Sequence, residues 1–199
     1  MKGRESGMPE EAMWRTYFDA DRMVEKLECA KRKVENVAEF GSGYGTFTLP
    51  VASLTSGIVH TFDIEPGLVS LVLKKAQNAG LTNVRGEARD FVVQGTGLKT
   101  ASVDHVMIYN LLHIEEPTGL LREAYRILKP GGQISIIHWK HDSNTPRGPS
   151  LAIRPRPEEC RAWAETVGFE FFREPDLSEC CENHYGLILV RPDENGSAA

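Results

Sequence analysis

The segment V-A-E-F-G-S-G-Y-G at residues 37–45 constrains the fold of this chain more than any other. Its apolar residues Val37, Ala38 and Phe40 are typical of a short buried strand. Three glycines follow at alternate positions: Gly41, Gly43 and Gly45. They let the backbone turn sharply with no side chain between it and a ligand. A helix expected from about Thr46 would direct its free N–H groups at that ligand. The segment predicts a nucleotide-binding corner, and a plain strand-to-helix connection is the alternative.

The details of this turn indicate which cofactor it binds. Thr46 stands where the dinucleotide fingerprint G-x-G-x-x-G has its third glycine, which disfavours NAD. Glu39 places a carboxylate at the end of the strand, where it would repel a pyrophosphate. The same carboxylate suits a ligand that carries an ammonium and a sulfonium group. S-adenosylmethionine carries both.

An acid followed by G-x-G-x-G resembles the first motif of the class I S-adenosylmethionine-dependent methyltransferases. The resemblance extends over residues 103–139, where an apolar strand precedes a helix, L-K-P-G-G and another strand. It implies an α/β fold with a doubly wound, mostly parallel sheet of seven strands, an antiparallel last strand and helices on both faces. The closing antiparallel pair, expected near residues 170 and 185, distinguishes such sheets from NAD-binding ones. The implied activity is methyl transfer from S-adenosylmethionine to a small-molecule acceptor.

A second acid ends the run I-V-H-T-F-D, about twenty residues beyond the glycines. This acid, Asp63, stands where α/β nucleotide-binding folds place a carboxylate for the ribose hydroxyls. The resemblance implies that Asp63 is this ribose ligand and that Ile64 packs on the adenine. Glu65 is the alternative, although Pro66 after it is more typical of an acid near the start of a helix.

The other cofactor candidates follow the next two predicted strands. The resemblance implies that Asp90, after a strand at residues 83–88, binds the adenine amino group, and that the backbone N–H of Phe91 serves a ring nitrogen. Glu87 is a weaker candidate because it falls inside that strand, and a solvated loop charge is the alternative for either acid. Asn110 ends the apolar run from residue 103 and is a further cofactor-binding candidate.

Methyl transfer is an in-line displacement, so the protein chiefly has to align donor and acceptor. A base is needed only where the acceptor is a protonated hydroxyl, amine or thiol, and histidine suits that task. We expect His113 or His141 to be this base, because both follow strands that end on the cofactor side of the sheet. His138 falls at the end of a strand, where a core role is the alternative.

The long proline-rich loop at residues 140–157 is expected to overhang the cofactor edge as a lid over the acceptor. Its arginines are candidate ligands for an anionic substrate: Arg147, Arg154 and Arg156. They could instead neutralise the acids of the helix that follows.

Composition bounds the rest of the assignment. With 199 residues and 41% hydrophobic content, we expect one compact unit. The resemblance implies an N-terminal cap at residues 1–27 and one methyltransferase domain at 28–192, and the polar tail at 193–199 is expected to be disordered. The net charge of -5 leaves no basic footprint for nucleic acid. No apolar segment resembles a signal or a membrane span, so a cytoplasmic protein is expected. The four cysteines lack C-x-x-C spacing, so reduced thiols and no bound metal are expected, and a soft-metal or arsenic site at Cys180 and Cys181 is the alternative. The roles of Cys180 and Cys181 and the oligomeric state stay open, and a homo-oligomer is compatible with the sequence.

Two other functions compete with an active methyltransferase. One is a catalytically inactive methyltransferase fold that binds the cofactor and regulates a partner. The other is an NAD-dependent oxidoreductase.

Overall fold

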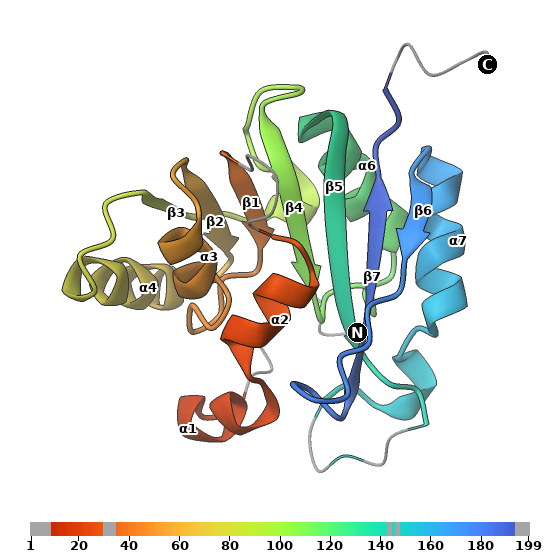
Figure 1. Ribbon diagram of the computed structural model, residues 1–199, viewed down its shortest axis with the longest axis horizontal. Helices are drawn as coiled ribbons and strands as arrows, with labels where there is room; N and C mark the ends of the chain where they lie inside the picture. The colour runs from red at the N-terminus through yellow and green to blue at the C-terminus, as the bar shows by residue number, and fades with distance from the viewer. Residues whose placement is uncertain (1–8, 30–34, 143–144, 146–147, 194–199) are drawn as a thin grey trace.

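The apolar runs of the sequence form the strands of one seven-stranded sheet (Figure 1). The computed structural model describes residues 9–29, 35–142, 145 and 148–193. In this part of the chain the strands are β1 (Val37–Phe40), β2 (Val59–Asp63), β3 (Val84–Ala88), β4 (Val103–Tyr109), β5 (Leu128–Trp139), β6 (Glu170–Arg173) and β7 (His184–Val190). Their order across the sheet is β3-β2-β1-β4-β5-β7-β6. Strands β1 to β5 pair in parallel, and β7 runs antiparallel to both β5 and β6. The expected doubly wound, mostly parallel fold is confirmed.

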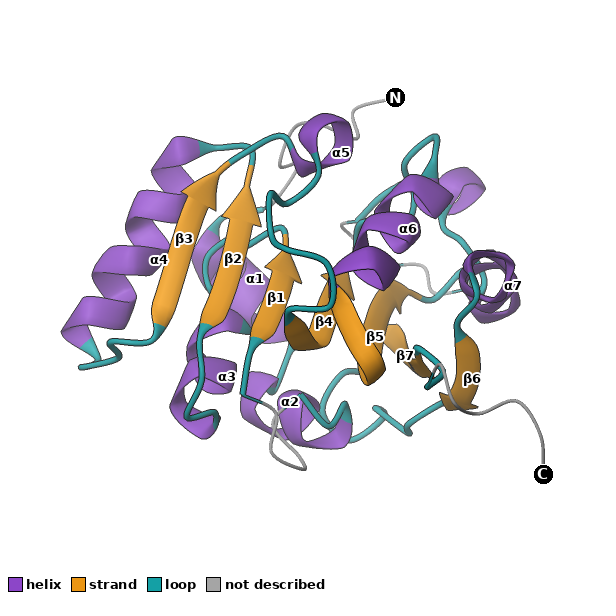
Figure 2. Cartoon of the chain, turned by 90° about the horizontal axis from the view of Figure 1, so that it is seen from above, coloured by secondary structure: helices purple, strands orange, loops and turns teal. Residues whose placement is uncertain are grey.

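Helices cover both faces of this sheet (Figure 2). One face packs against α2 (Ala20–Lys26), α3 (Thr48–Leu54) and α4 (Pro66–Asn78). The other face packs against α5 (Phe91–Gln94), α6 (Pro117–Ile127) and α7 (Pro157–Val167). Alternation along β1 sends Ala38 and Phe40 into the α6 side and Val37 into the α3 side, and Glu39 shares the α3 side with Val37. Three shorter pieces are α1 (Glu11–Trp14) and the 3₁₀ turns η1 (Arg15–Tyr17) and η2 (Leu151–Ile153).

The strand order reverses between β1 and β4. From β1 the chain winds outward through β2 to β3, and it then crosses back to β4 on the other side of β1. The connections that leave the carboxyl ends of β1 and β4 therefore diverge. In open α/β sheets, ligands bind at this point of divergence.

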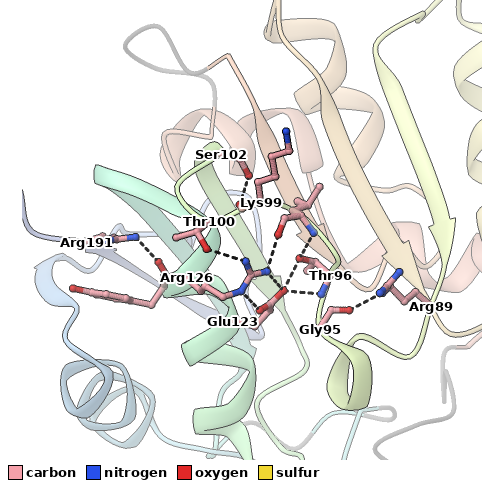
Figure 3. Close-up of polar contacts among 11 residues, drawn as sticks. Arg89, Gly95, Thr96, Lys99, Thr100, Ser102, Glu123, Arg126 and Arg191 are labelled. Atoms are coloured by element: carbon pink, nitrogen blue, oxygen red, sulfur yellow. Dashed lines mark hydrogen bonds and ion pairs between the residues drawn. The ribbon is translucent and has the colours of Figure 1, made fainter.

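A polar cluster fastens the connection between α5 and β4 to α6 (Figure 3). The carboxylate of Glu123 accepts hydrogen bonds from the backbone N–H and the hydroxyl of Thr96, at 2.7 and 2.6 Å. It also pairs with Arg126, whose guanidinium donates to the carbonyl of Leu98 at 2.8 Å. This cluster supports the loop that carries the chain from α5, at the carboxyl end of β3, back to the start of β4.

Three local differences separate the observed elements from those expected. Helix α3 begins at Thr48, two residues after the expected start, and the short helix α5 was not predicted. Strand β5 begins at Leu128, so it includes the L-K-P-G-G sequence that was expected to lie between the helix and the strand. The pairing of β5 with β4 is irregular here, because the register shifts between Leu128 and Gln133. Gly131, whose φ is +74°, donates its N–H to the carbonyl of Arg191 at 2.8 Å.

None of the helices in the described ranges has the length and apolar character to span a membrane.

Candidate functional site

The glycine turn lies at the point of divergence, after β1. Gly41, Gly43 and Gly45 have φ values of +81°, +48° and +78°, which favour glycine. A Cβ atom on Gly41 would lie 3.3 Å from Cδ1 of Leu111, in the connection after β4. A Cβ on Gly45 would lie 3.1 Å from Cγ2 of Val72 on α4. The turn therefore fits closely against both neighbouring connections. The N–H groups of Gly41 and Ser42 donate to the carbonyl of Phe62 at 2.9 and 2.8 Å, and that of Gly45 donates to the carbonyl of Ser42 at 2.9 Å, so the turn is held by its own backbone.

Glu39, immediately before this turn, is buried with only 3% of its surface exposed. Its Oε2 accepts hydrogen bonds from the hydroxyls of Thr48 on α3 and Thr61 on β2, the latter at 2.6 Å. Burial raises the pKa of this carboxyl to about 7, the two hydroxyls oppose that shift, and the nearby Asp63 adds to it. Among the described residues, Oε1 of Glu39 accepts no hydrogen bond, so it is available to a positively charged group.

The two threonines were missed by the sequence reasoning. Thr48 opens the helix after the glycine turn, and Thr61 lies two positions before Asp63 on the same face of β2. The period of two along β2 could have identified Thr61, because Glu39 and Thr61 are neighbours in the parallel pairing of β1 with β2.

Asp63 joins the end of β2 to the glycine turn. Its Oδ2 accepts from the backbone N–H of Gly43 at 2.9 Å and lies 3.4 Å from the hydroxyl of Ser42. Its Oδ1 accepts from the N–H of Glu65 at 3.0 Å. The carboxylate is buried, with 5% exposed, while Ile64 beside it is partly exposed. Glu65 is exposed and makes no side-chain cap to α4.

Asp90 and Phe91 follow β3 at the same edge. Asp90 is the N-cap of α5 and accepts from the N–H of Val93 at 3.3 Å. The ring of Phe91 is buried and stacks on Phe40, with centroids 5.3 Å apart. Its side chain therefore belongs to the core, which leaves only backbone groups of this residue for a ligand.

Asn110 stands directly after β4 in a left-handed conformation, with φ of +57°. Its N–H donates to the carbonyl of Ile137 at 2.8 Å, which fixes its position beside β5. Within the described structure, both polar atoms of its side-chain amide are buried without a hydrogen-bond partner. Buried amides of this kind are nearly always satisfied, so the orphaned amide indicates a polar ligand.

The three candidate histidines lie at or after the carboxyl ends of β4 and β5, but their environments differ. His113 is partly buried, and its Nδ1 lies 3.1 Å from Nε2 of His138. His138 is fully buried at the end of β5, and burial lowers its pKa to about 3. Burial also lowers the pKa of His113. His141 is partly exposed, two residues beyond β5.

The candidate arginines of the loop at residues 140–157 differ in burial and contacts. Arg154 is buried and donates to the carbonyls of Pro149 and Lys140, at 2.8 and 3.1 Å, and to the hydroxyl of Thr145 at 2.8 Å. These contacts favour a structural role in holding the loop together. Arg156 is exposed at the start of α7, and Arg147 lies outside the described residues.

Aromatic side chains of the N-terminal segment pack on this edge of the sheet. Phe18 meets the ring of Phe47, which follows the glycine turn, at a centroid distance of 5.3 Å. Tyr17 meets Trp139 at the end of β5, at 5.2 Å. The hydroxyl of Tyr44 donates to the carbonyl of Pro9 at 3.0 Å. The segment therefore bridges the glycine turn and the end of β5.

Together these groups fit S-adenosylmethionine. The edge offers a turn of three glycines with positive φ, two buried carboxylates in Glu39 and Asp63, and the amide of Asn110, which has no hydrogen-bond partner in the described structure. Carboxylates suit its ammonium, sulfonium and ribose hydroxyls, and an amide suits donors and acceptors alike.

Comparisons with known proteins agree with this geometry. A family model described as a methyltransferase domain matches residues 38–136. The aklanonic acid methyltransferase DauC of Streptomyces sp. (strain C5) is 32% identical over 105 residues, which cover 51% of this chain and 47% of that protein. The mitochondrial 2-methoxy-6-polyprenyl-1,4-benzoquinol methylase of Dictyostelium discoideum is 28% identical over 131 residues, covering 62% and 40%. This chain spans between 40% and 47% of the length of its curated relatives.

A solved structure supports the fold. The S-adenosylmethionine-dependent methyltransferase from Aquifex aeolicus superposes with a TM-score of 0.74 and covers 88% of this chain and 90% of its own. Because the sequence identity is 21%, this likeness bears on the fold alone.

Proposed function

We propose that this chain is a class I S-adenosylmethionine-dependent methyltransferase that transfers a methyl group to a small-molecule acceptor. The observation that carries the proposal is the convergence of Glu39, Asp63 and the orphaned amide of Asn110 around the glycine turn. The names of the relatives support the acceptor class, since aklanonic acid and a benzoquinol are both small organic molecules. The net charge of -5 favours neither a nucleic acid nor another polyanion.

The cofactor is S-adenosylmethionine, which supplies a methyl carbon already activated by its sulfonium sulfur. We assign the ammonium end to Glu39, whose Oε1 is available, and the ribose hydroxyls to Asp63. Asp90 and the backbone of Phe91 are assigned to the adenine, and Ile64 to its ring face. Asn110, at the end of β4, is assigned to the side of the cofactor that faces the acceptor.

Alignment of the acceptor is the main task of the remaining residues. Effective molarities of roughly 10⁵ to 10⁸ M from such positioning supply most of the acceleration of a displacement reaction. The lid at residues 140–157 and the cap at residues 1–27 are proposed to exclude water and to select the acceptor. Arg156, with Arg147, is proposed to attract an anionic acceptor, while Arg154 holds the lid.

A protonated acceptor also needs a base. His113 is the first candidate, because it leaves β4 three residues after Asn110, and His141 is the second. A neutral imidazole accepts a proton directly, and the lowered pKa of His113 keeps it neutral at physiological pH.

We also propose a reducing compartment such as the cytoplasm. Four cysteines are free and buried: Cys29, Cys160, Cys180 and Cys181. Unpaired thiols are typical of cytosolic proteins.

Transfer of a radiolabelled methyl group tests the proposed function. The full chain is incubated with methyl-labelled S-adenosylmethionine and a cell extract, which is then separated into small molecules, proteins and nucleic acids. Label is expected in the small-molecule fraction, and Asp63→Asn should reduce its amount. Label confined to protein or nucleic acid would contradict the acceptor class. Tight cofactor binding without any transfer would instead favour the inactive regulator.

A further inference from the structure

Two histidine rings meet where the carboxyl ends of β4 and β5 lie side by side. Nδ1 of His113 lies 3.1 Å from Nε2 of His138, and the rings approach edge to face with centroids 5.3 Å apart. His138 is fully buried, whereas His113 is only partly buried. The inner ring is therefore fixed by the core, and the outer ring is held against it.

The backbone determines which nitrogen of the inner ring carries its proton. Nδ1 of His138 lies 3.4 Å from the carbonyl oxygen of Trp139. A carbonyl oxygen can only accept, so Nδ1 of His138 must carry the hydrogen. In a neutral imidazole the other nitrogen then has a lone pair, so Nε2 of His138 is an acceptor.

The same reasoning extends to the outer ring. An acceptor at Nε2 of His138 requires a donor at Nδ1 of His113, since two lone pairs cannot share a hydrogen bond. Burial lowers the pKa of each ring, which favours the neutral form of both. For His138, His113 and Arg154 lower the pKa further, and the hydrogen bond to the carbonyl of Trp139 opposes this shift. A neutral His113 protonated at Nδ1 has an unprotonated Nε2. Among the described residues, this Nε2 makes no hydrogen bond.

We propose that His138 is a positioning residue that fixes His113 in the Nδ1–H tautomer, so that Nε2 of His113 can take the proton of the methyl acceptor. This inference rests on the proposed function and concerns acceptors with an O–H, N–H or S–H group. The acceptor's bond to hydrogen breaks, and its proton goes to Nε2 of His113. The freed electron pair forms the bond to the methyl carbon, while the carbon–sulfur bond breaks and leaves its electrons on a neutral thioether.

Histidine-ring nitrogen NMR tests the tautomer directly. The full chain is labelled with ¹⁵N-histidine and recorded near neutral pH, with no cofactor or acceptor added, and His113→Gln assigns the signals of His113 by their loss. In the wild-type protein, His113 is expected to show a protonated Nδ1 and an unprotonated Nε2.

Two substitutions of His138 separate a positioning role from a merely structural one. His138→Leu removes the acceptor and should release His113 from the Nδ1–H tautomer. His138→Gln offers a side-chain oxygen at the same reach and should keep it. His60→Gln, which removes a partly buried histidine from β2, is the matched control and should leave His113 unchanged.

A wild-type His113 protonated at Nε2 would overturn the inference without any variant having to fold. An unchanged tautomer in a folded His138→Leu protein would also overturn it. Calorimetric titration of S-adenosylmethionine into the wild-type protein addresses the proposed function separately. Absent cofactor binding would contradict that function while leaving the tautomer measurement valid.

Discussion

At the scale of single residues, Glu39 is both buried and ionisable, and burial usually disfavours a charged carboxylate. The residue is nearly inaccessible, yet within the part of the chain that the structure describes its ionisable carboxyl is supported by two hydroxyls and by no positive side chain. Its pKa of about 7, against an ordinary 4.5, is therefore a consequence of burial. A positively charged ligand would supply the missing partner.

This raised pKa predicts a pH-dependent stability. The folded protein retains the proton on Glu39 up to about pH 7, while the unfolded chain loses it near pH 4.5. Protonated Glu39 therefore adds to the free energy of unfolding. This contribution of about 3 kcal/mol is fully present below pH 4.5 and is lost as the pH rises to about 7. The free energy of unfolding is measured with urea at pH 5 and at pH 8. Between these pH values it should fall by about 3 kcal/mol more in the wild-type protein than in Glu39→Gln.

The control for this measurement is Glu170→Gln, which changes an exposed carboxyl on β6. Its free energy of unfolding should follow that of the wild-type protein at both pH values. Equal pH dependence in Glu39→Gln and the wild-type protein would show that Glu39 titrates normally.

The sequence predicted where Glu39 and Asp63 stand, but not what they contact. The glycines mark where the strand ends, so they also show that Glu39 lies near this end. The partners Thr48 and Thr61 come from other elements, so only the pairing of β1 with β2 and the packing of α3 reveal them. Likewise, Arg154 was a candidate either for an anionic substrate or for the acids of the following helix, whereas its hydrogen bonds to the carbonyls of Pro149 and Lys140 depend on the fold of the loop.

At the scale of elements, helix α4 links the N-terminal segment to the glycine turn. The ammonium of Lys75 donates to the carboxylate of Glu11 at 2.6 Å and to the carbonyl of Tyr44 at 2.9 Å. Local patterns could not predict this link, because its partners are 64 and 31 positions away from Lys75. Strands and amphipathic helices, by contrast, follow from the spacing of neighbouring residues.

This link predicts that Lys75→Met loosens the N-terminal segment. Chymotrypsin, which cleaves after aromatic residues, should cut Lys75→Met near Trp14 and Tyr17 faster than it cuts the wild-type protein. The partly exposed ion pair is worth about 1 kcal/mol or less, so the affinity for S-adenosylmethionine should fall by at most roughly 5-fold. Lys74→Met, which changes the exposed neighbour on the same helix, should alter neither property. Equal cleavage of the two variants would contradict the link.

At the scale of the whole molecule, the strand order brings the site together. The glycine turn after β1 and the residues after β4 come from segments about seventy positions apart, and they meet because the sheet reverses its winding between these strands. The family resemblance predicted a doubly wound, mostly parallel sheet of seven strands with an antiparallel last strand, and the structure adds the order of the strands. The sequence did not predict helix α5 or the early start of β5, since both depend on contacts between distant segments.

The central claim is that this edge binds S-adenosylmethionine through its buried carboxylates, and calorimetric titration tests it most directly. Asp104→Asn is the matched control, because Asp104 also accepts backbone N–H bonds, from Asn36 at 2.9 Å and Glu35 at 3.2 Å, but lies at the opposite end of β4. The wild-type protein and Asp104→Asn should bind S-adenosylmethionine alike and show no tight binding of NAD. Asp63→Asn should bind S-adenosylmethionine roughly 10- to 100-fold more weakly, as expected for a lost hydrogen bond to a charged group. Unchanged affinity in Asp63→Asn, or tight binding of NAD in place of S-adenosylmethionine, would contradict the account.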